Sequence, residues 1–78
     1  MAVDDNVGNY IVVFKSGISA MEQDETVGKI KKMGGVVKYE FSELLSGVAV
    51  EMPVSAVSAL KSDPNVDDVE EDRTVHIN

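Results

Sequence analysis

The feature that most constrains the fold of this 78-residue chain is a strand–helix–strand pattern that occurs twice. In the first half, Tyr10–Phe14 is β-branched and aromatic throughout, which predicts a strand. Ser19 and Glu22 have capping-box spacing, in which each side chain satisfies a backbone N–H of the other, so a helix is predicted from there. Gly34-Gly35 ends that helix, because a glycine can adopt the left-handed conformation that closes the last turn.

A β-hairpin is predicted in the middle of the chain. Residues 36–41 follow the two-residue period of a strand, and Val37, Tyr39 and Phe41 are expected to share one face. Residues 47–52 alternate in the same way. Two alternating segments joined by a short loop are typical of a hairpin.

A second helix and a last strand complete the pattern. Pro53 suits the first position of a helix, where its missing N–H would have no partner, and the helix is expected to run to about Ser62. Residues 63–65 (Asp-Pro-Asn) predict a turn. Residues 66–72 alternate poorly, so the strand predicted there depends on its two valines and on its place in the order.

The order strand, helix, strand, strand, helix, strand indicates an α+β fold. Right-handed crossovers would place both helices on one face of a four-stranded antiparallel sheet, which is the ferredoxin-like βαββαβ sandwich. We expect a flexible N-terminal arm at 1–9, a globular domain at 10–73 and a C-terminal tail at 74–78.

One face of such a sheet is uncovered. The strand at 10–14 is apolar on both sides, with Ile11 and Val13 on one side and the remaining residues on the other. Whichever set points away from the helices leaves apolar side chains exposed, which suggests a protein partner. The alternative is a central strand that the arm or long neighbouring side chains partly cover.

Acidic residues gather towards the C-terminus of a chain whose net charge is -7. They are Asp63, Asp67, Asp68, Glu70, Glu71 and Asp72. This charge argues against binding to nucleic acid, which requires clustered Lys and Arg. The acidic stretch is interpreted either as a solvated edge or as a patch that meets positive potential on a partner, and charge alone favours the first.

The composition excludes several other classes. The chain has no cysteine, so no disulfide or thiolate metal site is expected, and a reducing compartment fits. Residues 1–6 lack the basic and apolar regions of a secretory signal, and no apolar run approaches membrane-spanning length. We expect no membrane partner, a cytoplasmic or vacuolar location, and a monomer when free.

An enzymatic role is not expected. His76 is the only histidine, and it lies near the end of the chain, where nothing would fix its tautomer or pair it with a nucleophile. The serines have no base nearby in a rigid element, and the carboxylate pairs suggest no enclosed cleft. The glycines form no phosphate-binding signature. No catalytic residue, metal or cofactor is therefore predicted.

The final segment, residues 74–78, is short and mostly apolar, and it follows the last predicted strand. It resembles the acyl half of a cleaved peptide. A groove that binds extended peptide would be its natural receptor, and such grooves are typical of proteases.

Several stretches of the chain together resemble one known family: residues 10–15, 32–37, 47–50, 63–66 and 69–72, with Phe41 between. They are similar to the subtilisin-type propeptides and to the free-standing inhibitors built on the same domain. The Val-Glu-Glu-Asp run at 69–72, followed by a short tail, is the most specific element. The ending at 75–78 resembles that of fungal inhibitors of the vacuolar subtilisin-like proteinase B.

The resemblance implies a protein inhibitor of subtilisin-like serine proteases, with a propeptide-like domain at 10–73. In the family, the open sheet face docks on two parallel surface helices of the protease, and carboxylates cap the N-termini of these helices. By position, the capping residues here would be Glu70 and Asp72.

The resemblance also gives the tail a role. It would lie in the substrate groove as an added strand, bound like a reaction product. Asn78 would occupy the pocket beside the catalytic serine, and Val75 an apolar pocket three residues earlier. The tail residues are Thr74, Val75, His76, Ile77 and Asn78.

Two alternatives stay open. The first is a detached propeptide that acts as an intramolecular chaperone for its own protease domain, which a reading frame continuing past Asn78 would favour. The second is a small-molecule-binding regulatory domain on the same sandwich, which ligand-dependent stabilisation would reveal.

Overall fold

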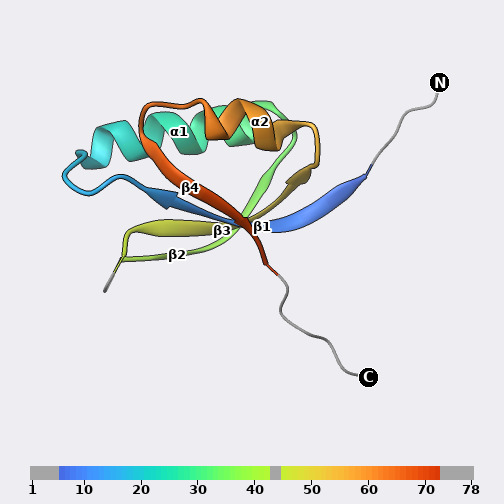
Figure 1. The fold of residues 1–78 in the computed structure, drawn as a ribbon, viewed down its shortest axis with the longest axis horizontal. Helices are drawn as coiled ribbons and strands as arrows, with labels where there is room; N and C mark the ends of the chain where they lie inside the picture. Colours follow the sequence, from blue (N-terminus) through green and yellow to red (C-terminus); the bar gives the residue numbers. More distant parts are fainter. Residues whose placement is uncertain (1–5, 43–44, 73–78) are drawn as a thin grey trace.

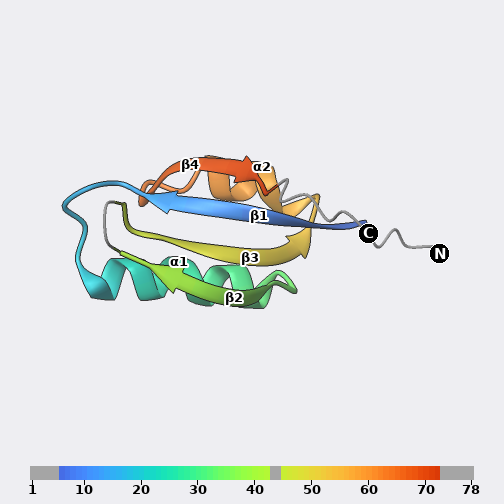
Figure 2. The ribbon, with the colours of Figure 1, turned by 90° about the horizontal axis from the view of Figure 1, so that it is seen from below.

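A computed structural model describes residues 6–42 and 45–72 of the chain. Its elements are β1 (Val7–Phe14), α1 (Ala20–Lys32), β2 (Val36–Phe41), β3 (Gly47–Pro53), α2 (Ala56–Lys61) and β4 (Val66–Glu71). The four antiparallel strands lie in the order β2-β3-β1-β4. Both helices cover the same side of the sheet, and the strands seen from below show the uncovered side (Figures 1 and 2). The predicted ferredoxin-like α+β class is confirmed.

Both ends of α1 follow from local sequence. The Ser19 hydroxyl accepts from the Glu22 N–H at 3.1 Å, and the Glu22 carboxylate accepts from the Ser19 N–H at 2.9 Å, which completes the capping box. At the other end, the Gly35 N–H donates to the Ile30 carbonyl at 2.9 Å, and Gly34 has a φ of 92°. This is the Schellman arrangement, in which glycine takes the left-handed position that a side chain would disfavour.

The hydrophobic core lies between the sheet and the helices. It is formed by Val12, Phe14, Ile30, Val48, Val50, Met52, Ala56, Leu60, Val66 and Val69. Every strand except the edge strand β2 contributes buried side chains to this cluster, so the core depends mainly on how β1, β3 and β4 are paired.

Two predicted boundaries are wrong. Strand β1 begins at Val7 rather than Tyr10, because residues 7–9 pair with the end of β3, and these residues therefore belong to the sheet rather than to an arm. Pro53 ends β3 instead of beginning the second helix, which starts at Ala56. The fixed φ of proline suits both the end of a strand and the start of a helix. The strand is favoured here because the backbone pairing continues past Pro53: the Val54 N–H donates to the Asn6 carbonyl at 3.0 Å. Residues 1–5 and 73–78 lie outside the described residues, and the division into arm, domain and tail is otherwise a prediction.

The predicted facing of β2 is also wrong. Val37 pairs with Val50, but the next pair in register is Tyr39 with Ala49, so Lys38 is an extra residue in a β-bulge. The bulge turns Val37 towards the helices and leaves Tyr39 on the opposite face. A strict two-residue period would have put both side chains on one face.

Strand β4 contains a second irregularity, which explains its poor alternation. Val66 pairs with Phe14 and Asp68 pairs with Val13, so Asp67 is the extra residue. As a result Val66 and Val69 are both buried in the core, although they are three residues apart. The predicted strand is confirmed, and its irregular pattern reflects the bulge.

Gly47 is required by close packing. A Cβ at this position would lie 2.6 Å from the Val12 carbonyl oxygen and 3.0 Å from the Phe41 ring. We predict that Gly47→Ala lowers the free energy of unfolding by about 1–3 kcal/mol, as overpacking does elsewhere. Urea denaturation followed by circular dichroism measures this.

Gly28→Ala is the matched control, because a Cβ there has no atom within 4 Å and the residue is inside α1. This control should raise stability by about 0.5–1 kcal/mol. Equal effects of the two substitutions would contradict the assigned packing role of Gly47.

Candidate functional site

The uncovered face of the sheet is the candidate site. The strand register places on it Asn9, Ile11 and Val13 of β1, Val36, Tyr39 and Phe41 of β2, Gly47, Ala49 and Glu51 of β3, and Asp68 and Glu70 of β4. The face thus has an apolar centre and a row of carboxylates along one edge strand. The prediction that Ile11 and Val13 form one side of β1 is confirmed, and this side is the one away from the helices.

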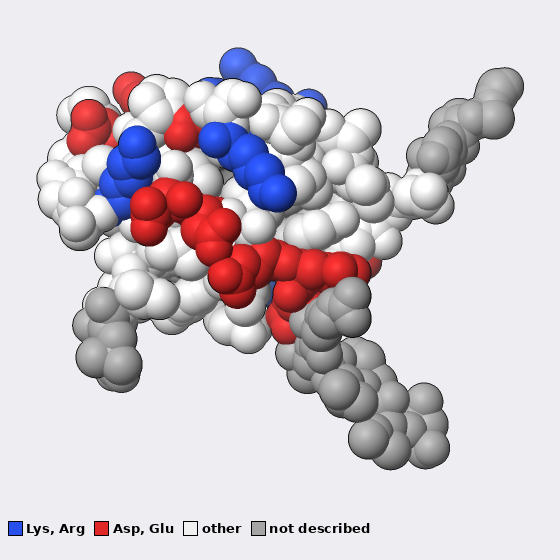
Figure 3. Space-filling view, viewed as in Figure 1, with Lys and Arg blue, Asp and Glu red and all other residues white. Residues whose placement is uncertain are grey.

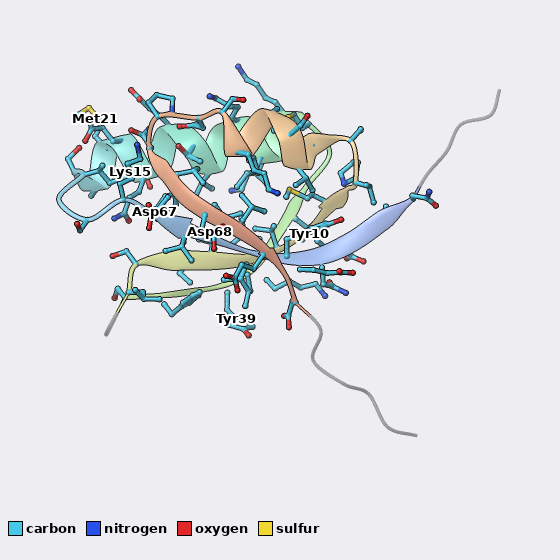
Figure 4. All side chains as sticks on the ribbon, in the orientation of Figure 1. Tyr10, Lys15, Met21, Tyr39, Asp67 and Asp68 are labelled. Carbon is cyan, nitrogen blue, oxygen red and sulfur yellow. The ribbon has the colours of Figure 1, made fainter. Side chains whose placement is uncertain are left out.

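An aromatic pair covers part of the apolar centre. The rings of Tyr39 and Phe41 have centroids 6.3 Å apart and are tilted by 53°. Tyr39 is 61% exposed and projects from the side of the sheet opposite the helices (Figure 4). The Phe41 ring lies over Gly47, whose missing side chain makes room for it. Aromatic rings on a rigid strand provide contact area at small conformational cost, as protein interfaces require.

The carboxylate row follows from the β4 bulge. Asp68 lies opposite Val13 and Glu70 opposite Ile11, and both acids are exposed. Acidic side chains form a band along β4, next to the open face (Figure 3). A side-chain hydrogen bond with Asp68, together with the charge of that group, raises the pKa of the Glu70 carboxyl.

The sequence-predicted site residues lie partly within the described residues. Glu70 is on the open face, and its helix-capping role stays a prediction. The Asp72 N–H donates to the Asn9 carbonyl at 2.8 Å, which extends the β1–β4 pairing by one residue, so alternation puts the Asp72 side chain on the face of Glu70. The tail at 74–78 lies outside the described residues.

Sequence reasoning missed three members of the face. Tyr39 and Phe41 were assigned to the side of Val37, because the bulge at Lys38 has no signal in the local pattern. Asp68 was not singled out, although the two-residue period from Glu70 leads back to it. The signal that would have located the β4 bulge is the three-residue spacing of its two valines.

Two further properties of the described residues bear on the site. Among residues 6–42 and 45–72, no three His, Cys, Asp or Glu side chains are grouped in a way that would hold a metal ion. In the same ranges, neither helix has the length and apolar character needed to cross a membrane.

The fold and the face define a small α+β domain with one exposed, partly apolar sheet surface bordered by carboxylates. Residues 9–78 match the family model described as Peptidase inhibitor I9. The chain belongs to this family, the subtilisin-propeptide-like domains, which confirms the resemblance predicted from the sequence.

Individual relatives agree with this assignment. Subtilisin E from Bacillus subtilis (strain 168) is 39% identical over 67 residues, which cover 86% of this chain and 17% of the relative. Subtilisin NAT from Bacillus subtilis subsp. natto matches to the same extent. The protein named Uncharacterized protein C338.12 from Schizosaccharomyces pombe is 25% identical over 68 residues, 87% of this chain and 88% of that protein. The chain therefore spans 17% of the length of the subtilisins that it matches.

The pKa of Glu70 tests whether the Asp68 and Glu70 side chains lie close together in the carboxylate row. In Asp68→Asn the neighbouring negative charge is lost, so the pKa of Glu70 should fall towards that of an ordinary glutamate. A ¹³C NMR titration of the Glu70 carboxyl measures the shift. An unchanged Glu70 titration in Asp68→Asn would show that the two side chains do not interact. The control is Glu40→Gln, on the other side of the sheet, which should leave the Glu70 titration unaltered.

Proposed function

We propose that this chain is a protein inhibitor of a subtilisin-like serine protease. It docks the open sheet face on the enzyme and places the segment after β4 in the substrate groove. The observation that supports this most directly is the open face itself, where an apolar centre with the exposed Tyr39 lies beside an acidic edge strand. Membership of a peptidase inhibitor family supports a role as a ligand of the protease rather than as an enzyme.

The docking surface suits a partner with two properties. Its apolar centre, with Tyr39 and the half-buried Ile11 and Val13, requires a complementary apolar patch. Its carboxylate row requires positive potential, which helix N-termini supply through their unpaired N–H groups and the helix dipole. In this proposal Glu70 and Asp72 cap two surface helices of the protease, and Asp68 adds a third charge to the row.

The tail begins directly where β4 ends. Asp72 is still hydrogen-bonded to β1, so the residues after it start from a fixed point at the edge of the docking face. Residues 74–78, extended as a strand, would span roughly 17 Å. They would add a strand in the groove and bind as a product does, with Asn78 next to the catalytic serine and Val75 in an apolar pocket.

Removal of the tail tests its role. Deleting residues 74–78 should raise the inhibition constant against a subtilisin by about 100-fold or more, because the groove contacts of the added strand are lost. The melting temperature should not change, since the core lies within β1–β4 and the helices.

Deleting residues 1–5 is the matched control, since it removes an equal length from the other end and should leave inhibition as it is. Inhibition by the chain without residues 74–78 that equals that of the full chain would refute the role of the tail.

The carboxylate row is tested separately. Glu70→Gln combined with Asp72→Asn should weaken inhibition by about 3- to 30-fold, because each charge at a helix N-terminus contributes roughly 0.3–1 kcal/mol. The loss should shrink in high salt. Glu40→Gln is a charge-matched control on the helix-covered side of the sheet. An equal loss in the control would mean that net charge, rather than capping, determines the affinity.

A second candidate function follows from the relatives. The 39% identity to subtilisins supports a propeptide that assists the folding of its own protease domain, using the same face. Accelerated refolding of a denatured subtilisin domain in the presence of the chain would support it, and a reading frame that continues into a catalytic domain would distinguish a propeptide from a free-standing inhibitor. The cytoplasmic or vacuolar location, the monomeric free state and the absence of nucleic-acid and membrane partners stay predictions.

A further inference from the structure

Strand β4 carries the carboxylate row, and its backbone pairing is less continuous than that between β1 and β3. It is an edge strand that pairs only with β1, and its bulge at Asp67 interrupts that pairing. A regular strand in phase with Val69 would turn Asp67 towards the core, whereas one in phase with Val66 would turn Asp68 and Glu70 inwards. Burying an unpaired carboxylate is costly, so only the bulged arrangement is stable. The strand therefore depends on a fixed starting point.

A buried polar cluster provides this starting point. The turn before β4 is tied to α1 by Asp63, whose carboxylate accepts from Lys29 at 2.6 Å, from the Asn65 N–H at 2.7 Å and from the Thr26 hydroxyl at 3.4 Å. The Asn65 amide group donates to the Thr26 hydroxyl at 3.2 Å and to the Glu22 carbonyl at 3.1 Å. We call these four side chains, Thr26, Lys29, Asp63 and Asn65, the Asp63 clamp.

The clamp connects directly to the pairing of β4. The Asn65 carbonyl accepts from the Lys15 N–H at 2.9 Å, and the Val66 N–H donates to the Asp63 carbonyl at 3.0 Å. These two bonds join the turn to the end of β1 and to the first residue of β4. Thr26 and Asp63 are among the buried residues of the domain, with exposed fractions of 0% and 4%.

We propose that the Asp63 clamp is the positioning device of the docking face: it holds the edge strand β4 in place, so that its carboxylates and the tail behind them are already arranged for the partner. This rests on the proposed function. Without the clamp, the start of β4 would open locally while the β1–β3 pairing persisted. The protease would then have to order the strand on binding, which lowers the affinity.

Lys29 and Asp63 are an ion pair with one partner in solvent, since their side chains are 49% and 1% exposed. Burial alone would raise the pKa of the Asp63 carboxyl, but hydrogen bonds from Lys29, the Asn65 backbone and Thr26, together with the Lys29 charge, outweigh burial and lower it. The carboxylate is therefore ionised under ordinary conditions, which is the form that accepts all of these bonds.

Thr26 allows a test that separates positioning from stability. Thr26→Val keeps the volume and removes the hydroxyl, whereas Thr26→Ser keeps the hydroxyl and removes a methyl group from a fully buried site. Amide hydrogen exchange at Lys15, whose N–H reaches the clamp turn, reports on the start of β4. Exchange at Phe14, whose N–H donates to the Ser46 carbonyl on the opposite side of β1, reports on the rest of the sheet.

We expect Thr26→Val to accelerate amide exchange at Lys15 by about tenfold relative to exchange at Phe14, because a buried hydrogen-bond partner is lost. The same substitution should raise the inhibition constant against a subtilisin by about tenfold, after correction for the folded fraction. Thr26→Ser should leave the ratio of the two exchange rates and the corrected inhibition constant within about twofold of those of the unmodified chain.

Either of two results would overturn the proposal: an unchanged ratio of Lys15 to Phe14 exchange in Thr26→Val, or equal behaviour of the valine and serine variants. A raised exchange ratio with unchanged inhibition would overturn the link to docking. If the unmodified chain itself fails to inhibit subtilisin, the proposed function fails, while the exchange rates still show whether the clamp holds β4.

Discussion

The structure depends on the fact that its two helices cover only one face of the sheet. The covered face of the sheet supplies most of the core, with Val12 of β1 packed between Val48 and Val69 of the neighbouring strands. The other face of the same central strand is also apolar, at Ile11 and Val13. Among residues 6–42 and 45–72, no helix or strand covers these side chains, so the described part of the domain presents a partly apolar surface of the kind that protein partners bind.

Irregularities in the two edge strands determine which side chains lie on the open face. Each edge strand contains one bulge, at Lys38 in β2 and at Asp67 in β4. The first bulge brings Tyr39 onto the open face, and the second keeps Asp68 there while the strand still contributes two valines to the core. Bulges also disrupt the regular edge that would otherwise pair with other chains.

Local features of the fold were predictable from sequence, and features set by distant contacts were not. The capping box at Ser19 and the closing glycines of α1 involve residues within a few positions, so their signals are complete in the sequence. The facing of Tyr39 depends on its pairing with Ala49, and the strand at residues 7–9 depends on pairing with the end of β3. The Asp63 clamp joins residues 37 positions apart, which no local pattern reveals.

The candidate site was partly predictable for the same reason. Glu70 follows from the period of β4 and from the family resemblance, whereas the aromatic pair on the open face required the bulge in β2 to be known.

The Asp63 clamp makes the stability of the fold depend on pH. Because the pKa of Asp63 is lower in the folded chain, its contribution to stability is present above the pKa of an unfolded aspartate, and it is lost as the pH falls through the folded value.

The central claim is that the open face is the surface that meets a subtilisin-like protease. Cross-saturation NMR of the labelled chain bound to unlabelled subtilisin tests this most directly, because it identifies the side chains in contact with the enzyme. The account predicts saturation transfer to the methyl groups of Ile11 and Val13, which are half-buried on the open face of the free chain. Transfer confined to exposed residues of the helix layer, such as Met21, with none to the open face, would contradict it.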